Sequence, residues 1–244
     1  MTPIEDHVAE AQRLIEAAAG RGAVLRALGG VAVHMRCPSA LAPPLARTPK
    51  DLDFASTSDD RQALIALFRE TGYEEDAEFN ALHGKTRLFF WDAGNSRQAD
   101  VFLDRISMCH SLHLADRLGE HPATLSVSDL LLLKLQVFET NDRDYKDALS
   151  LLLDHSEGEL DLDYITHLLA TDWGWWRTAT MVLERLDGYA RGLDGFDRKN
   201  DVHYRVRELL GAIERAPKSR RWKMRAQVGE RARWYELPEE TLPG

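Results

Sequence analysis

The pattern of apolar residues changes near residue 125, and this change limits what the chain can fold into. Before it, short apolar stretches of strand length alternate with stretches of helical spacing; after it, every apolar stretch has helix length. Alternation of the two kinds predicts a sheet covered by helices, whereas sustained helical spacing predicts a helical bundle. We therefore predict an α+β fold, with a mixed sheet flanked by helices in residues 1–124 and a mainly helical region in residues 125–244.

Three segments of the first half have the character of strands. Residues 51–56 (DLDFAS) follow a Pro-rich insert at 37–49, and residues 86–92 and 98–106 are separated by Gly94, Asn95 and Ser96. These turn residues predict that the last two segments form a β-hairpin.

Composition limits the classes of partner. The chain has 31 basic and 40 acidic residues and a net charge of −9, which argues against nucleic acid binding over the whole surface but allows a local basic patch. The cysteines, Cys37 and Cys109, lack metal-ligand spacing and suit reduced thiols, so we expect a cytoplasmic protein. The N-terminus has neither the basic start nor the apolar run of a secretory leader, and no apolar run reaches about 18 residues, so no membrane partner is expected.

Two aspartates on one predicted strand are the strongest indication of chemistry. Side chains alternate along a strand, so Asp51 and Asp53 lie on the same side with Cα atoms about 6.5 Å apart. Carboxylates so close repel unless a cation lies between them, and Mg²⁺ prefers such oxygen ligands. Asp100 is costly within an apolar strand, and it joins the pair if its strand neighbours residues 51–56. The alternative is a solvated strand end and a hydrogen-bonded strand aspartate, which is common for so short a motif.

Two further features suit a phosphate. Gly29 and Gly30 precede a helical stretch and can bring backbone N–H groups close to an anion, although such a pair also makes plain turns. Lys134 has apolar neighbours three and four positions away, which predicts a buried position. A buried ammonium needs an anion, and a triphosphate and an internal partner (Asp144 or Asp147) are equally good candidates from spacing alone.

Together these residues resemble the nucleotidyltransferase superfamily, which has the polymerase-beta-like fold, and in particular its AbiEii-type and uncharacterised bacterial members. The resemblance covers roughly residues 20–180. A Gly-Gly pair, a Thr-x-x-Asp-x-Asp strand and a later strand aspartate are matched, as are a lysine and a basic-Asp-x-x-Asp signature; the matching residues are Gly29, Gly30, Arg47, Thr48, Asp51, Asp53, Asp100, Lys134, Arg143, Asp144 and Asp147. Val31 stands where most members have serine.

The resemblance implies a catalytic and metal-binding site of Asp51, Asp53 and Asp100 that holds two Mg²⁺ ions. It also implies a nucleotide-binding site, formed by Gly29, Gly30, Thr48, Lys134, Asp144 and Asp147. The implied reaction is transfer of NMP from an NTP, with release of pyrophosphate, to a hydroxyl or phosphate acceptor on a small molecule, an RNA end or a protein.

Two alternatives to this enzyme stay open. One is the toxin of a toxin–antitoxin pair that acts on tRNA and has an antitoxin partner. The other is a catalytically decayed nucleotide-binding or interaction protein, which Val31 favours.

Two other segments have competing interpretations. Residues 218–225 (KSRRWKMR) are either an RNA contact or, more commonly, a solvated basic helix end. Trp173, Trp175 and Trp176 either stack on a flat ligand or, more commonly, pack in the core.

Overall fold

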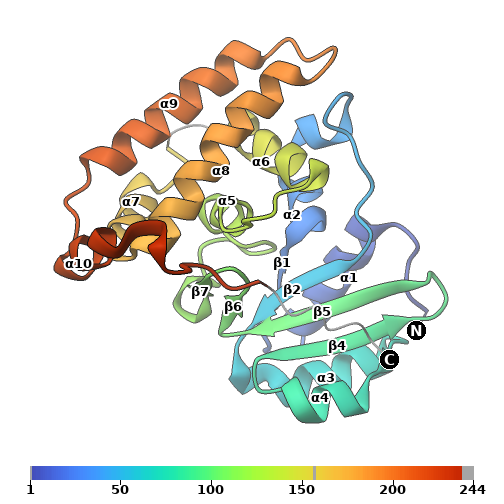
Figure 1. The fold of residues 1–244 in the computed structure, drawn as a ribbon. Helices are drawn as coiled ribbons and strands as arrows, with labels where there is room; N and C mark the ends of the chain where they lie inside the picture. The colour runs from blue at the N-terminus through green and yellow to red at the C-terminus, as the bar shows by residue number, and fades with distance from the viewer. Residues whose placement is uncertain (1, 156–157, 238–244) are drawn as a thin grey trace.

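The computed structural model describes residues 2–155 and 158–237, whose arrangement is shown in Figure 1. The first half contains, in order, α1 (His7–Ala19), β1 (Arg26–Leu28), α2 (Gly29–Arg36), η1 (Pro38–Leu41), β2 (Leu52–Ser56), η2 (Ser58–Asp60), α3 (Arg61–Glu70), β3 (Glu74–Glu75), α4 (Ala77–His83), β4 (Arg87–Asp92), β5 (Arg97–Leu103), β6 (Arg105–Ser107), β7 (Ser111–His113) and η3 (Ala115–Arg117). The second half contains α5 (Val127–Leu135), α6 (Asp142–Asp154), α7 (Leu162–Thr171), α8 (Trp173–Gly192), α9 (Lys199–Arg215), α10 (Arg220–Val228) and η4 (Gly229–Arg231).

One mixed sheet organises the first half. Its strand order is β1-β2-β5-β4-β3, and a separate two-stranded sheet pairs β6 with β7. β2 and β5 run parallel, whereas the other neighbouring pairs of the five-stranded sheet are antiparallel. β4 and β5 form the predicted hairpin. The predicted α+β class, a mixed sheet with helices followed by a mainly helical region, is confirmed.

Helices α3 and α4 lie below the sheet in Figure 1, and the helical second half lies above it. Four apolar residues of α3 at helical spacing are buried: Leu64, Ile65, Leu67 and Phe68. The Phe68 ring stacks on Phe90 of β4 with centroids 4.3 Å apart, and it meets Phe54 of β2 edge-on at 6.2 Å. Because strand side chains alternate, burial of Phe54 on this lower side directs its neighbour Asp53 to the opposite side.

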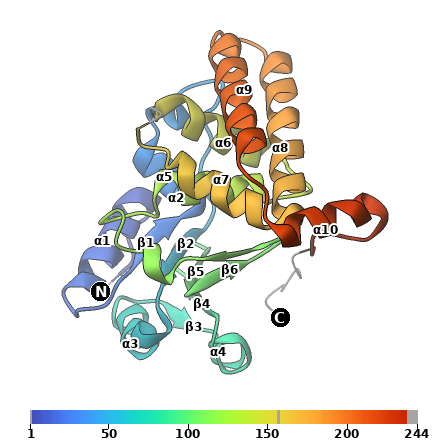
Figure 2. The same ribbon diagram turned by 90° about the vertical axis from the view of Figure 1, so that its left-hand side faces the viewer.

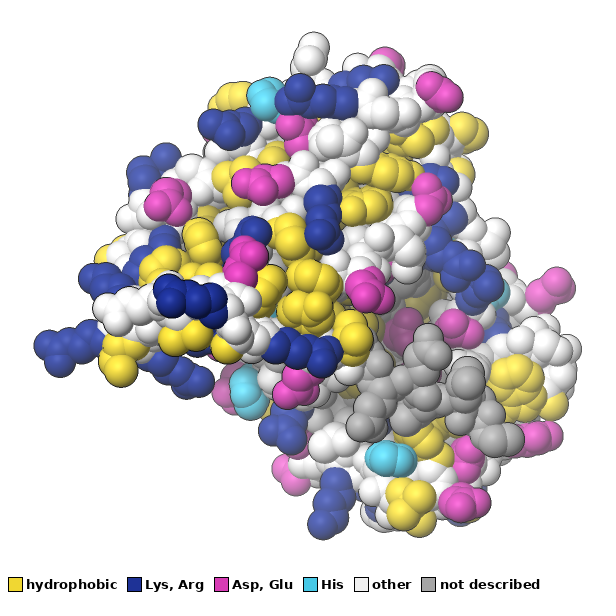
Figure 3. Space-filling view, viewed as in Figure 1, with side chains coloured by type: hydrophobic (Ala, Val, Ile, Leu, Met, Phe, Trp, Pro, Cys, Tyr) yellow, Lys and Arg dark blue, Asp and Glu magenta, His cyan; other side chains and the backbone are white. Residues whose placement is uncertain are grey.

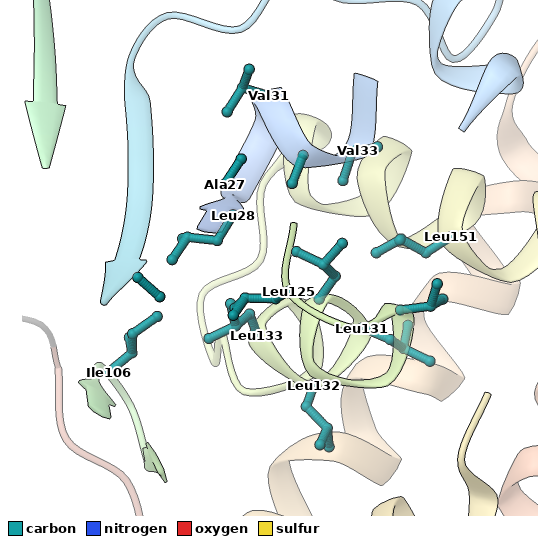
Figure 4. Packing of buried hydrophobic residues seen from close by; sticks show 14 of the residues in the cluster. Ala27, Leu28, Val31, Val33, Ile106, Leu125, Leu131, Leu132, Leu133 and Leu151 are labelled. Atoms are coloured by element: carbon teal, nitrogen blue, oxygen red, sulfur yellow. The ribbon is translucent and has the colours of Figure 1, made fainter. Parts of the chain in front are cut away.

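Helix α5 joins the two halves of the molecule. It is apolar on nearly all sides, as expected for a helix surrounded by protein, and Ser126 caps its start by accepting a hydrogen bond from the backbone of Asp129. Figure 4 shows Leu133 on the side of α5 that faces Leu28 of β1, and Leu131 on the side that faces Leu151 of α6. One buried cluster includes residues of both halves, so residue 125 marks a change in the kind of element, and the independence of 1–124 and 125–244 as domains stays a prediction.

The helical half ends in an element that leaves the bundle. Figure 2 shows α8 and α9 side by side and α10 projecting beyond them, and α10 has no buried residue. Within residues 2–155 and 158–237, no helix combines the length and apolar character needed to cross a membrane.

Replacing the central aromatic of the lower layer tests this packing. We expect Phe68→Ala to lower the free energy of unfolding by about 3–5 kcal/mol, because the ring is fully buried against two strands. Chemical denaturation followed by circular dichroism measures the change. Leu82→Ala, at a side chain of α4 that is 72% exposed, is the control and should change it by less than about 0.5 kcal/mol. A similar small effect of Phe68→Ala would contradict the packing described.

Candidate functional site

The parallel pairing of β2 with β5 brings the aspartates of two distant segments together. Asp53 is directly opposite Asp100 in the register, and residues paired across neighbouring strands point to the same face of a sheet. Asp51 lies at a bend just before β2 begins at Leu52, and it is near enough for its charge to act on Asp53. Asp100 is only 3% exposed, whereas Asp51 and Asp53 are half-buried. The two strands are therefore neighbours, as predicted, and their acidic residues share the upper face of the sheet.

This closeness changes how readily the carboxyl groups ionise. Burial, together with the neighbouring charges of Asp100 and Asp51, raises the pKa of Asp53 to about 7. Burial also raises the pKa of Asp100, although a hydrogen bond from Arg87 opposes that shift. The charges of Asp100 and Asp51 thus make Asp53 harder to ionise, and a cation between the carboxylates would remove that penalty.

Arg87 supplies a positive charge at this face from the neighbouring strand β4. Its Nε donates to Oδ1 of Asp100 at 2.6 Å, and its guanidinium lies near the rings of Phe79 and Phe102, with centroid distances of 5.5 and 5.2 Å. Sequence reasoning missed this residue. An arginine within an otherwise apolar strand of a hairpin was the signal that could have found it.

The acidic residues have oxygen donors of the kind that suit Mg²⁺. Within the residues that the structure describes, the side-chain carboxylates of Asp51 and Asp53 accept no hydrogen bond and form no ion pair. However, no set of three or more His, Cys, Asp or Glu side chains in the described part converges in the way a metal ion requires. The three carboxylates therefore suit Mg²⁺ in their chemistry but are not arranged as its ligands in the metal-free protein, where Arg87 holds Asp100 in another contact.

The Gly-Gly pair lies where α2 begins, directly against these acids. Gly29 has a positive φ of 63°, and a Cβ on it would lie 2.5 Å from Oδ2 of Asp53. A Cβ on Gly30 would overlap the guanidinium of Arg47. Position 29 therefore favours glycine through its positive φ and its closeness to Asp53, and a side chain at position 30 would displace the guanidinium of Arg47.

A second charge network adjoins that helix start. Arg47 donates two hydrogen bonds to Asp147, from Nε at 2.7 Å and from Nη2 at 2.5 Å. Lys134 pairs with Oδ2 of Asp147 at 2.9 Å and with Oδ1 of Asp144 at 3.0 Å. Burial alone would lower the pKa of Lys134, but these two carboxylates outweigh it and raise it. Of the two candidate anions for Lys134, the structure shows the internal partners.

The other predicted residues have varied positions. Thr48 is exposed, in the extended segment between Arg47 and the acidic strand. Trp173 and Trp175 are buried, and Trp176 packs partly buried against the core, so the core interpretation of the tryptophans is confirmed. The pairing of Arg47 with Asp147 was not predicted, because it joins residues 100 positions apart.

Comparison with known proteins identifies no family for this chain. No known protein family matches the sequence, and no curated protein is significantly similar to it. The resemblance to nucleotidyltransferases therefore rests on the residues described above.

The raised pKa of Asp53 makes the stability of the metal-free protein depend on pH. The folded-state pKa of about 7 lies above the ordinary value of 3.8, so the folded state holds the proton more tightly than the unfolded state. The contribution of Asp53 to the free energy of unfolding is fully present below about pH 4, and it is lost as the pH rises through 7. We expect Asp53→Asn to abolish it, so that the variant gains about 1–4 kcal/mol relative to the wild type between those limits.

Urea denaturation in EDTA across this pH range measures the difference between wild type and variant. Asp59→Asn, at an exposed aspartate of η2, is the matched control and should follow the wild-type curve. Parallel curves for wild type and Asp53→Asn would show that the acidic cluster does not strain the fold.

The ion pair of Arg87 with Asp100 should compete with a bound cation. We expect Arg87→Gln to bind Mn²⁺ or Mg²⁺ about tenfold more tightly than the wild type, because the variant leaves Asp100 without its guanidinium partner. The metal-induced rise in melting temperature, measured across a metal titration, reports the affinity. An unchanged or weaker response to metal in Arg87→Gln would show that Asp100 is not a metal ligand.

Proposed function

We propose that this chain is a divalent-metal-dependent nucleotidyltransferase that moves NMP from an NTP to a hydroxyl or phosphate acceptor. One observation carries the proposal: Asp53 and Asp100 are register partners on parallel strands, with a glycine-bounded helix start in contact with Asp53. A plain solvated strand end would not explain that contact, whereas the burial of Asp100 is also accounted for by its hydrogen bond from Arg87.

The start of α2 suits the triphosphate. Free backbone N–H groups at a helix start, and the positive end of its dipole, attract phosphate oxygens. Glycine at positions 29 and 30 leaves this backbone uncovered. The guanidinium of Arg47 lies against Gly30 and provides a fixed cation beside the same site. Asp147 and Asp144 hold Lys134 in the buried layer behind it, so Lys134 acts by positioning Asp147 and hence Arg47.

Asp51, Asp53 and Asp100 would hold the metal. Bound Mg²⁺ supplies neutralisation of the charge that builds up on the transferred phosphoryl group and on the leaving pyrophosphate. The residues of this chain provide the remaining requirements, which are orientation of the triphosphate, orientation of the acceptor and a group that takes a proton.

The reaction is a substitution at the α-phosphorus. The oxygen of the acceptor hydroxyl forms a bond to this atom while the bond to the oxygen that bridges to the β-phosphate breaks. Pyrophosphate leaves with that oxygen, and the hydroxyl proton passes to Asp100.

A second candidate is a nucleotide-binding protein on the same fold that has lost catalysis. The ion pair of Arg87 with Asp100 favours it, because a guanidinium there neutralises a proposed metal ligand. Val31 favours it too, since a fully buried apolar side chain provides no hydroxyl for the phosphates.

Substitution of Asp53 tests the proposal. We expect Asp53→Asn to reduce pyrophosphate release from NTP by about 100-fold or more, since loss of a direct metal ligand costs at least as much as loss of an outer partner. Asp59→Asn is the control and should keep wild-type turnover. Thermal shift with each NTP, with and without Mg²⁺, separates the two candidates. Stabilisation by metal and nucleotide without turnover in any acceptor mixture would favour the binding protein, and turnover retained in Asp53→Asn would refute the proposed site.

A further inference from the structure

A long groove leads away from the aspartate cluster. It consists of two hollows of about 580 and 870 Å³ that share five lining residues: Ser107, Met108, Arg233, Tyr235 and Glu236. At one end it reaches Arg87 and Phe102, which lie on the two strands that meet at Asp100. At the other end it reaches Arg221 and Arg225 of α10. The groove thus connects the candidate catalytic face of the sheet with the helix that projects from the bundle.

Positive charge is concentrated at the far end of this groove. Residues 215–233 contain eight Arg or Lys residues and one acidic residue, in a chain whose net charge is −9. Figure 3 shows Lys and Arg side chains gathered around α10. Such a local patch on an acidic protein attracts a polyanion to one place and repels it elsewhere.

Two of the arginines in the groove are free to bind a ligand. In the described part of the chain, the guanidinium groups of Arg105 and Arg221 form no hydrogen bond or ion pair, and both residues are exposed. By contrast, Arg225 is fixed: it donates to the backbone carbonyls of Gly229 and Ala232 at 2.7 and 2.8 Å, and it lies 4.7 Å from the ring centroid of Trp173. Arg225 therefore shapes the wall, while Arg105 and Arg221 offer unused guanidinium donors, which suit phosphate oxygens.

The shared middle of the groove is a firmly held C-terminal strap, residues 232–237. Tyr235 stacks on Phe138 with centroids 3.7 Å apart, and Trp234 donates from Nε1 to Thr178 at 3.2 Å. The backbone N–H of Glu236 donates to the carbonyl of Cys109 at 3.1 Å. The strap thus places Arg233 and an aromatic ring halfway along the groove, between the sheet and α10.

A ligand with repeated negative charges fits this arrangement best. Arginines occur at both ends and in the middle of the groove, so a single phosphate would use only one part of it. Two partly exposed aromatic side chains, Phe102 and Tyr235, lie between these arginines. Alternation of cations and aromatic rings is typical of surfaces that bind unpaired bases and the backbone that joins them.

We propose that this groove binds single-stranded nucleic acid and presents its terminal hydroxyl to the aspartate cluster as the acceptor. This inference rests on the proposed function, because it names the acceptor class for the substitution described above. Arg105 and Arg221 contact phosphates of the nucleic acid, and the end of the nucleic acid strand lies beside Phe102 and Asp100.

Binding without turnover tests the groove by itself. Fluorescence anisotropy of the full chain in EDTA, with a labelled single-stranded RNA of mixed sequence and with the matching DNA, measures affinity as a function of salt. We expect Arg105→Glu and Arg221→Glu each to weaken binding about tenfold and to reduce the slope of log affinity against log salt by about 1. Arg207→Glu, at an exposed arginine of α9 outside both hollows, makes the same change in charge and should alter affinity less than twofold.

The outcomes distinguish failure of the acceptor inference from failure of the proposed function. Loss of affinity in the two groove variants supports the proposal, and comparison of the two probes identifies which nucleic acid is bound. No binding of either probe, equal weakening by Arg207→Glu, or equal competition by polyglutamate would overturn it. If those results come with intact stabilisation by NTP and Mg²⁺, only the acceptor inference fails. If nucleic acid binds but no NTP stabilises the protein, the proposed function fails and the binding groove stands.

Discussion

The parallel pairing of β2 with β5 is the contact on which the rest of the site depends. It joins segments about fifty positions apart and sets Asp53 opposite Asp100, on the side away from the aromatic layer of Phe54, Phe68 and Phe90. The burial that stabilises one face of these strands therefore forces like charges together on the other. Two carboxylates at this spacing cost free energy, which Arg87 offsets for Asp100 and which a cation between the carboxylates would offset further.

The helical half stabilises the site through a separate set of charges. Arg47 approaches from the segment before β2, whereas Lys134 and Asp147 come from α5 and α6, which belong to the helical region. Desolvation costs free energy when a buried carboxylate is placed between two cations, and removal of one partner leaves an uncompensated buried charge. Such a network therefore fixes the positions of its side chains more than it adds stability. Its effect is to hold Arg47 against the start of α2. The second half of the chain is thereby part of the site, even though it contributes none of the three clustered aspartates.

Local sequence patterns were sufficient for the fold class and for the acidic pair. The alternation in residues 51–56, the hairpin with its turn at 94–96 and the change of spacing near residue 125 all depend on short-range periodicity, and the structure agrees with them. The position of Asp100 beside Asp53 depended on strand order, which periodicity does not provide. The partners of Lys134 stayed undecided for the same reason: spacing shows that a lysine is buried but not which anion lies opposite. Arg87 was missed because its importance arises only when β4 and β5 pair.

Arg87 links the acidic cluster to the groove. It donates to Asp100 and also lines the hollow that continues toward α10. A phosphate of the proposed acceptor that drew this guanidinium toward the groove would weaken the hold of Arg87 on Asp100. A released Asp100 repels Asp53 more strongly and gains more from a cation. Under the proposed function, acceptor and metal therefore favour each other's binding, and linkage makes this effect equal in both directions. The ion pair between Arg87 and Asp100 favours the decayed enzyme when the free protein is considered alone. Under the proposed function, binding of the acceptor would break this ion pair and leave Asp100 able to bind a metal ion.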